Sequence, residues 1–239
     1  MPDSRQALAP AAHAALRPSE YTAALIQVLR ADADRIRDMS VLEIGSGSGV
    51  VLAALGALGA ASLCGVDIED EAIASSSLLL GDLGHGGIAE LHRGDMWLPV
   101  AGRRFDLIGA NLPHFPMGPA EIAGRLPTWS AGGADGRRLL DVFLAGLAEH
   151  LAPGGRAVIT HNAFVDLGRT RELLARSGLS LRIALTTLVY IAPEKLARMT
   201  ADVLRAEDGR TIHRYGPYTF GDMHIVEIES ARVGAGAAV

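Results

Sequence analysis

The stretch Val41-Leu42-Glu43-Ile44-Gly45-Ser46-Gly47-Ser48-Gly49-Val50 decides the fold class of this chain. An apolar run, interrupted by one acid, leads into three glycines at alternate positions and then into the apolar residues 51–55. This order is typical of a buried parallel strand, a tight loop and the first turn of a helix. Glycine lets the backbone turn sharply and approach a ligand closely, so we expect a ligand at this loop.

The glycine spacing and the acid before it indicate which ligand. A dinucleotide-binding loop has the pattern G-x-G-x-x-G, and its third glycine would stand where this chain has Val50. Glu43 would also repel a pyrophosphate group. Both observations favour a cationic ligand, and S-adenosylmethionine, which carries a sulfonium and an ammonium group, fits them. The alternative is an ordinary strand–helix turn of an α/β protein.

Composition narrows the class of protein. The chain has 239 residues, a net charge of −5 and 49% hydrophobic residues, which is typical of a soluble globular protein. No apolar run approaches the roughly 18–20 residues that cross a bilayer, so we expect no membrane segment and a cytoplasmic location. The negative charge makes nucleic acid an unfavourable partner. Cys64 is the only cysteine and the histidines show no metal-ligand spacing, so we predict no metal.

Strands and helices alternate along the chain. We predict a helical segment over residues 1–39, with Ser19 as a helix cap, one α/β domain over residues 40–230, and a flexible tail over residues 231–239. The domain is expected to be a Rossmann-like, seven-stranded, mostly parallel sheet with an antiparallel last strand. We also predict a helix near Glu121, a helix over residues 193–204 and a loop over residues 210–221.

Acidic residues at the ends of later strands extend the predicted cofactor site. Asp67 lies about 20 residues beyond the glycine loop, where a carboxylate can accept both ribose hydroxyls of an adenosyl group. Asp95 is expected to accept the adenine amino group, with Met96 beside the ring; the alternative for Asp95 is a turn cap. The residues predicted to bind the cofactor are Glu43, Gly45, Gly47, Gly49, Asp67, Ile68, Asp95, Met96 and Asn111.

Taken in order, these segments resemble class I S-adenosylmethionine-dependent methyltransferases, and more closely the HemK/PrmC-type glutamine N5-methyltransferases. That group has Asn-Pro-Pro-Tyr where this chain has Asn111-Leu112-Pro113-His114, and Arg-Pro-Glu-Thr where it has Arg17-Pro18-Ser19-Glu20. The Gly-Gly-Ala-Asp-Gly run at 132–136 and the Pro-Gly-Gly at 153–155 are also similar. The resemblance implies the class I methyltransferase fold, S-adenosylmethionine as cofactor and methyl transfer to nitrogen.

The chain departs from that group in two ways. Leu112 replaces a proline and His114 an aromatic residue, which changes the amide-methylating motif. No helical recognition domain precedes the catalytic domain, so we expect a substrate other than a release factor.

Asn111 and His114 are the predicted catalytic residues. A planar amide, guanidine or aromatic amine delocalises its nitrogen lone pair and attacks poorly. The Asn111 oxygen and a following backbone carbonyl can accept its N–H groups and pull the nitrogen toward tetrahedral geometry. Pro113 stiffens the loop, and His114 offers a flat ring for stacking and a site for the departing proton. The alternatives are that Asn111 caps a turn and that His114 is exposed.

The predicted substrate contacts are Leu112, Pro113, His114, His161, Asn162 and Tyr215. We expect Tyr215, with Tyr218 or Phe220, to form a lid over the substrate mouth. These rings could instead pack on the helix at 193–204.

The main expectation is an N-methyltransferase for a small molecule or an amino-acid-like substrate with a planar nitrogen, with a homodimer as a possible assembly. Methylation of adenine or guanine in nucleic acid, or of a glutamine in a protein, is the alternative within enzymes. A non-catalytic S-adenosylmethionine-binding module is the alternative from another class.

Overall fold

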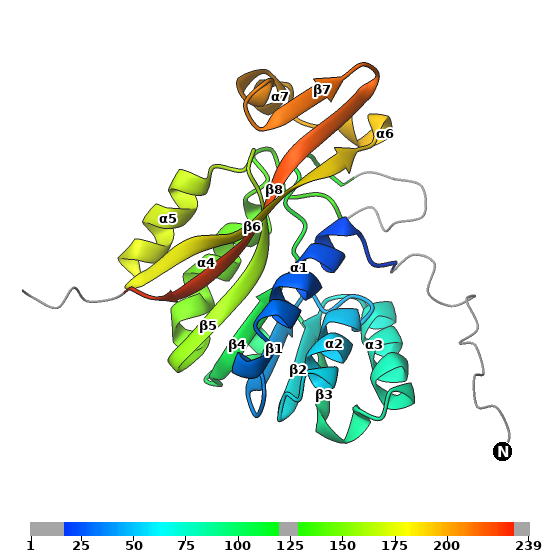
Figure 1. Ribbon diagram of the computed structural model, residues 1–239, viewed down its shortest axis with the longest axis vertical. Coiled ribbons are helices and arrows are strands. Elements are labelled where there is room, and N and C mark those ends of the chain that lie inside the picture. Colours follow the sequence, from blue (N-terminus) through cyan, green and yellow to red (C-terminus); the bar gives the residue numbers. More distant parts are fainter. Residues whose placement is uncertain (1–16, 120–128, 232–239) are drawn as a thin grey trace, which may run out of the picture.

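The computed structural model describes residues 17–119 and 129–231 as an α/β fold built on one mixed sheet (Figure 1). The sheet has eight strands in the order β3-β2-β1-β4-β5-β8-β6, with β7 paired to β8 alongside. The predicted α/β fold is therefore confirmed, and the sheet has one strand more than the seven predicted. The start of the segment predicted at 1–39, the helix predicted near Glu121 and the tail after residue 231 lie outside the described residues.

Strands and α-helices alternate along the chain from β1 to β6, except between β3 and β4, which only a 3-10 turn separates. The strands are β1 (Ser40–Ile44), β2 (Ser62–Asp67), β3 (Ala89–Arg93), β4 (Phe105–Ala110), β5 (Leu151–Asn162), β6 (Leu179–Ile191), β7 (Ile212–Tyr215) and β8 (Tyr218–Ser230). The helices are α1 (Glu20–Ala31), α2 (Val50–Ala57), α3 (Asp70–Asp82), α4 (Arg138–His150), α5 (Leu167–Arg176), α6 (Pro193–Leu196) and α7 (Ala201–Glu207). Short 3-10 turns are found at Ala33–Arg35, Gly86–Ile88 and Leu98–Val100.

Strand β1 is the point at which the direction of winding reverses. It pairs in parallel with β2 on one side and with β4 on the other, so Glu43 lies opposite both Gly65 and Gly109. The chain moves outward through β2 to β3, then returns to the other side of β1 for β4 and β5. In open α/β sheets a crevice forms at such a reversal, beyond the carboxyl ends of the strands. The glycine loop after β1 is at this place.

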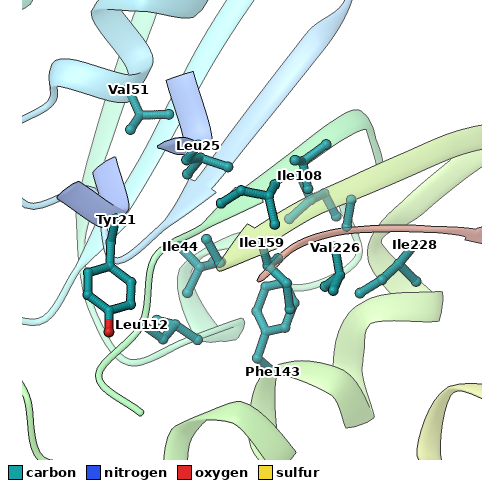
Figure 2. Packing of buried hydrophobic residues seen from close by; sticks show 14 of the residues in the cluster. Tyr21, Leu25, Ile44, Val51, Ile108, Leu112, Phe143, Ile159, Val226 and Ile228 are labelled. Atoms are coloured by element: carbon teal, nitrogen blue, oxygen red, sulfur yellow. The ribbon is translucent and has the colours of Figure 1, made fainter. Parts of the chain in front are cut away.

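Apolar residues on both faces of the sheet form the core. Helix α2 contacts both α1 and α3, and α4 and α5 form a second contacting pair. Figure 2 shows strand residues Ile108 and Ile159 with α1 residue Leu25 to one side and α4 residue Phe143 to the other. All four side chains are almost completely buried. Burial of this kind is the main favourable contribution to folding, at roughly 25 cal/mol per Å² of apolar surface.

Strand β8 runs against its neighbours in the sheet, as predicted for the last strand. Strand β8 is antiparallel to both β5 and β6. Its pairing with β5 ends at Asn162 and Met223, whereas its pairing with β6 continues to Ile191 and Thr219. Residues 188–222 thus extend past the end of β5 and carry α6, α7 and β7 with them, and we call them the arm (Figure 1, top).

Two predictions for the arm are wrong. Residues 193–204 form two short helices, α6 and α7, separated at Ala197–Thr200, because Thr200 instead donates from its N–H to Pro116 O over 2.7 Å. Residues 210–221 are a hairpin and not a loop, since Gly216 and Pro217 form a turn between β7 and β8 and Tyr215 pairs with Tyr218. A Gly-Pro turn between two β-forming runs is the signal that identifies such a hairpin. None of the described helices is both long and apolar enough to span a membrane.

Candidate active site

A cavity of about 530 Å³ opens beyond the carboxyl ends of β1, β2, β3 and β4. The predicted site residues in its wall are Glu43, Gly45, Gly47, Asp67, Ile68, Asp95, Met96, Asn111, Leu112, Pro113 and His114. Four predicted residues lie outside the wall: Gly49, His161, Asn162 and Tyr215. One crevice thus holds both the residues predicted for the cofactor and those predicted for methyl transfer.

The three glycines of the loop are needed for its backbone shape. Gly45, Gly47 and Gly49 have φ values of 74°, 52° and 77°, in the left-handed region that residues with a Cβ avoid. Gly49 caps α2 from behind the cavity, and a Cβ there would lie 2.8 Å from Ser76 Cα. The alternate spacing of the glycines therefore matches three left-handed backbone positions in the loop, two of them at the cavity wall.

Glu43 is a buried acid with an unused oxygen. It is 2% exposed, and its Oε2 has no hydrogen-bond partner among the described residues. Burial, and then the nearby charge of Asp67, raise the pKa of this carboxyl well above its usual range, while a hydrogen bond from the Leu52 backbone lowers it. A buried carboxyl of this kind is stabilised in its charged form by a cation. This is the chemistry that an ammonium or sulfonium group offers.

Asp67 holds the loop together as well as facing the cavity. Its Oδ2 accepts from the Gly47 N–H over 2.8 Å, and its Oδ1 accepts from the Glu69 N–H over 3.0 Å. Each carboxylate oxygen has two lone-pair sites, so both can still accept from a ribose hydroxyl.

The cofactor half of the cavity is the part lined by the predicted cofactor residues. Where Ile68, Met96 and Asp95 line it, it is suited to a flat apolar ring. Ile68 is 58% exposed at the wall, which is unusual for an isoleucine that follows a buried strand. Met96 has φ of 48°, one of only two left-handed residues other than glycine in the described ranges. A strained backbone of this kind persists where the surrounding structure fixes a side chain for function. Asp95 lines the same end of the cavity.

Asn111 is fixed by hydroxyl groups on two different elements. Ala110 pairs with Ile159, so Asn111 and Thr160 come next on neighbouring strands. The Thr160 hydroxyl donates to Asn111 Oδ1 over 2.9 Å, and Asn111 Nδ2 donates to Thr22 Oγ1 over 3.3 Å. The second lone pair of Oδ1 stays available for a substrate N–H.

His114 is buried and neutral. The alternative that we considered for it, an exposed side chain, is therefore wrong. The ring is 4% exposed, and its Nδ1 donates to Leu112 O. The proton on Nδ1 leaves a lone pair on Nε2, which has no hydrogen-bond partner among the described residues. Burial lowers the pKa of His114 to about 4, against the hydrogen bond to Leu112 that raises it.

His161 and Asn162 support the site from beneath and do not line it. Both are 0% exposed, so the prediction that they touch the substrate does not agree with their position. The Tyr21 hydroxyl donates to Asn162 Oδ1 over 2.7 Å, and His161 Nε2 is 2.9 Å from Thr170 Oγ1. Burial lowers the pKa of His161 to about 3. The end of β5 is covered because α1 and α5 pack over it.

The glycine run at 132–136 clamps the acceptor motif, a role that the sequence did not indicate. The N–H of Phe115 donates to Ser130 O over 3.0 Å, and the N–H of Gly132 donates to Phe115 O over 2.8 Å. A Cβ on Gly132 would lie 2.8 Å from His114 Cα, and one on Gly136 would lie 2.7 Å from His114 O. Only glycine lets the two backbones come this close.

The arm contributes residues that sequence reasoning missed. Tyr190 and Lys195 line the cavity, whereas the predicted Tyr215 is 60% exposed and contacts Phe220, with ring centroids 6.1 Å apart. Neither Tyr218 nor Phe220 is in the wall, so the predicted lid does not close over the mouth in this structure. Lys195 Nζ lies 4.0 Å from the centroid of the Phe115 ring. Its place on a short helix far along the chain gave no signal in the sequence.

Comparison with known proteins identifies the family. Residues 42–117 match the family described as Methyltransferase domain. A Methanocaldococcus jannaschii relative, named among the protein N5-glutamine methyltransferases, is 30% identical over 62% of this chain and 75% of its own length. The mouse protein named Methyltransferase HEMK2 is 31% identical over 58% of this chain and 67% of its length. The chain belongs to the class I S-adenosylmethionine-dependent methyltransferases. Within that class it is most like the HemK type, as the resemblance implied.

Other relatives extend this comparison. The release factor glutamine methyltransferase of Gloeobacter violaceus is 30% identical, and the methyltransferase described here spans 60% of its length. Solved structures share the fold: the ribosomal protein L11 methylase of Lactobacillus delbrueckii has a TM-score of 0.52 at 19% identity, covering 87% of this chain and 79% of its own. An E. cuniculi complex responsible for methylation of the eRF1 translation termination factor has a TM-score of 0.58 at 17% identity, covering 90% of this chain and 98% of its own.

The relatives correct one prediction and confirm another. A small-molecule substrate was expected, but this expectation is wrong, because the curated relatives named after a substrate are named after proteins, such as a release factor and ribosomal protein uL3. S-adenosylmethionine as the cofactor of the methyltransferase is confirmed by its family. The buried orphan oxygen of Glu43 and the left-handed glycines of the loop fit that group as well.

Proposed function

We propose that this methyltransferase transfers a methyl group to the side-chain nitrogen of glutamine in a protein. One observation carries the proposal: Asn111 Oδ1 and the neutral His114 stand together in one wall of the cavity, beyond the cofactor residues. The family supports it, since the relatives with glutamine in their names use proteins as acceptors.

The arrangement answers the main difficulty of amide methylation. The carboxamide nitrogen is a poor nucleophile because its lone pair is delocalised into the carbonyl. Hydrogen-bond acceptors on both N–H groups orient the nitrogen and favour its pyramidal form. We assign one of these acceptors to Asn111 Oδ1 and the other to Leu112 O, which has a second lone pair beside its bond from His114.

S-adenosylmethionine supplies an electrophilic methyl group when bound. The glutamine nitrogen then needs to lose one proton as its bond to carbon forms. His114 Nε2 is assigned to take it, because its lone pair is free and the ring is neutral at physiological pH. A pKa of about 4 makes His114 a weak base, yet an N-protonated amide is a far stronger acid, so the transfer is favourable.

The experiment uses the full chain, methyl-labelled S-adenosylmethionine and purified bacterial proteins. A release factor and ribosomal protein uL3 are chosen because relatives are named for them. Peptide mass spectrometry is expected to place one label on a glutamine side chain, with the Asn111→Ala variant as the background. Label on lysine, arginine or histidine nitrogen, or on a carboxylate oxygen, would overturn the assignment. So would the absence of label from both proteins and from whole bacterial extract.

A further inference from the structure

Another cavity, of about 340 Å³, lies beside β2 and β3, the strands at one edge of the sheet in Figure 1. Cys64, Glu90 and Arg103 are among the residues of its wall. Within the described residues, it shares no wall residue with the methyl-transfer cavity, neither with the cofactor half nor with the acceptor half, which is the part lined by residues 111–114. The proposed methyl transfer therefore leaves these side chains without a role.

The pairing of β2 with β3 brings a thiol, a carboxylate and an imidazole to one face of the sheet. Cys64 lies opposite Glu90 in the parallel register, and His92 comes two residues after Glu90. Side chains alternate between the two faces along a strand, so these three point the same way. Their donor atoms, one from each residue, all lie within 4.8 Å of one another. No other group of three such side chains lies this close together in residues 17–119 and 129–231.

The donor distances suit a small divalent cation. Zn²⁺ binds thiolate sulfur at about 2.3 Å and imidazole nitrogen or carboxylate oxygen at about 2.0–2.2 Å, so its tetrahedral ligands are about 3.3–3.6 Å apart. His92 Nε2 is 2.9 Å from Glu90 Oε1, which is the separation of a hydrogen bond donated by the ring. A metal ion takes the place of that proton when the imidazole and the carboxylate become its ligands. Cys64, which is 2% exposed and forms no disulfide, supplies the sulfur from the buried side.

The types of donor favour zinc over the common hard cations. Mg²⁺ and Ca²⁺ prefer oxygen ligands throughout, whereas Zn²⁺ accepts sulfur, nitrogen and oxygen together. Three protein ligands leave the fourth position of a tetrahedral ion to water, and the neighbouring cavity has room for it.

Arg103 is the cation that meets this cluster in the structure. Its Nη2 forms an ion pair with Glu90 Oε2 over 2.9 Å, and its Nη1 lies 3.4 Å from His92 Nε2. The guanidinium neutralises the carboxylate, and its charge opposes a second cation at the same place. The Arg103 side chain is 40% exposed, so it can turn toward solvent without a large loss of burial. A metal ion and Arg103 are therefore competitors for the cluster.

We propose that Cys64, Glu90 and His92 bind one Zn²⁺ ion, in competition with Arg103. The bound ion links β2 to the edge strand β3 and stabilises the folded chain by mass action. The prediction of no metal rested on spacing along the chain, which does not show a cluster made by strand register. Because the site has no residue in common with the proposed methyl transfer, either proposal can fail alone.

The test uses the untagged full chain, freed of metal with a chelator. Zn²⁺ is titrated in competition with a chromophoric indicator, and one ion per chain is expected to bind and to raise the midpoint of thermal unfolding. Co²⁺ is then used in place of Zn²⁺, because a thiolate ligand gives it an intense charge-transfer absorption in the near ultraviolet. Cys64 is the only cysteine of the chain, so that band identifies the ligand. Mg²⁺ is expected to compete with neither ion.

Variants assign the ion to the cluster. Cys64→Ser is expected to lose the Co²⁺ band. Cys64→Ser, Glu90→Gln and His92→Phe are each expected to lower Zn²⁺ affinity at least about tenfold, since even the outer partners of a metal are worth about 10–100-fold. Arg103→Gln is expected to bind Zn²⁺ severalfold more tightly, a gain that misfolding cannot produce. His213→Phe is the matched control, because it removes a histidine–carboxylate contact of the arm that belongs to no such cluster.

Each result decides for or against the inference. It is wrong if Co²⁺ gives no thiolate band with the wild type, or if Zn²⁺ binds as tightly to Cys64→Ser or His92→Phe as to His213→Phe. It is also wrong if Arg103→Gln binds Zn²⁺ no more tightly than the wild type. Binding of several ions that no cluster variant reduces is adventitious and overturns it too. Circular dichroism and S-adenosylmethionine affinity, both expected to stay as in the wild type, confirm that each variant is folded.

Discussion

The Tyr21 hydroxyl donates to Asn162 Oδ1 over 2.7 Å and so joins the first helix to the carboxyl end of β5 across 141 positions of sequence. The same Tyr21 ring meets the His114 ring edge-on, with centroids 5.8 Å apart. Asn162 is completely buried, but through Tyr21 it helps to fix the wall of the acceptor half. We therefore propose that Asn162 positions the wall through Tyr21, whereas we had expected it to touch the substrate.

Removal of that hydroxyl is the first test. Tyr21→Phe leaves Asn162 Oδ1 buried without its donor, which is expected to lower the free energy of unfolding by about 1–3 kcal/mol. We also expect turnover to fall while S-adenosylmethionine affinity stays within about twofold, because Tyr21 lies at the acceptor side. Urea unfolding, a methyl-transfer assay and calorimetry measure these three quantities. Tyr218→Phe, at a residue that is 57% exposed, is the control and should change none of them.

The second prediction concerns the buried acid of the cofactor half. Glu43→Gln removes the charge that the cofactor's cationic groups would pair with. We expect S-adenosylmethionine affinity to fall at least tenfold, by roughly 1.5–3 kcal/mol, which is typical of a hydrogen bond to a charged group. The exposed Glu71→Gln is the matched control, and calorimetry at pH 7.5 compares the two. Unchanged affinity in a folded Glu43→Gln protein would remove Glu43 from the cofactor site.

Glu43→Gln is expected to stabilise the cofactor-free protein, although it weakens the binding of the cofactor. The folded pKa of Glu43 is raised above the unfolded value, so its contribution to stability is complete below the unfolded pKa and is lost as pH rises through the folded pKa. Glu43→Gln has no such loss. Without cofactor, the variant is therefore expected to be more stable than wild type at pH 8 and to lose this advantage near pH 4. Thermal unfolding at the two pH values measures the difference.

Acid stability is the third prediction, and it depends on His114 and His161. Their folded pKa values of about 4 and about 3 lie below the unfolded value near 6.5. A depressed pKa means that the unfolded chain binds more protons in the window between these values. The contribution to stability is complete above about pH 6.5 and is lost as pH falls toward the folded values. Each histidine accounts for up to about 1.4 kcal/mol per pH unit of that loss.

His114→Phe removes one of the two titrating histidines, so a comparison with wild type gives the contribution of His114 alone. Between pH 6 and pH 5, the slope of unfolding free energy against pH is expected to be smaller than in wild type by about 1.2 kcal/mol per unit. Urea titrations at three pH values measure it. The opposing change at Glu43 is common to both proteins and cancels in the comparison. Equal slopes would mean that His114 is charged in the folded state.

Local sequence patterns predicted the cofactor half far better than the acceptor half. Gly45, Gly47 and Asp67 come from one strand–loop–helix–strand unit, where spacing along the chain sets position in space. Lys195 and Tyr190 reach the cavity only because β6 and β8 run past the end of β5 and carry the arm back over the motif. No periodicity in residues 188–222 encodes that return, since it depends on strand order.

The burial of His161 and Asn162 was missed for a related reason. Both lie at the carboxyl end of a central strand, where the rule for open α/β sheets places ligands. Here α1 covers Asn162 through Tyr21, and α5 covers His161 through Thr170. Which strand ends are open depends on helix packing across more than a hundred residues of sequence.

The fourth prediction tests the glycine clamp. Gly132→Ala puts a Cβ within 2.8 Å of Gly136 and His114 backbone atoms, which cannot move as a flexible side chain would. Overpacking of this kind costs about 1–3 kcal/mol, and the displaced motif should also reduce turnover. Gly118→Ala is the control, because no described atom lies within 4 Å of the added Cβ. If Gly132→Ala is as stable and active as Gly118→Ala, the clamp does not set the position of His114.

The last prediction separates positioning of the acceptor from binding of the cofactor. Asn111→Ala removes the proposed acceptor for the glutamine N–H, and it leaves Glu43, Asp67 and the glycine loop untouched. Turnover is expected to fall by about 10²-fold or more, with S-adenosylmethionine affinity within about twofold. Single-turnover kinetics with the methylated protein, together with calorimetry, measure both quantities.

Asn111→Asp is the sharper variant, because it keeps the shape of the side chain and changes the groups that it offers. Its two oxygens can accept from Thr160 and from a substrate N–H, but the donor to Thr22 Oγ1 is lost. Thr22 can reverse its hydroxyl and donate instead, while still accepting from the Ser19 N–H over 3.3 Å. We therefore expect partial activity that falls further at acid pH, as the new carboxylate takes up a proton. If Asn111→Asp is as inactive as Asn111→Ala at every pH, the amide's N–H donor and not its oxygen is what the reaction needs, and the acceptor role of Asn111 is wrong.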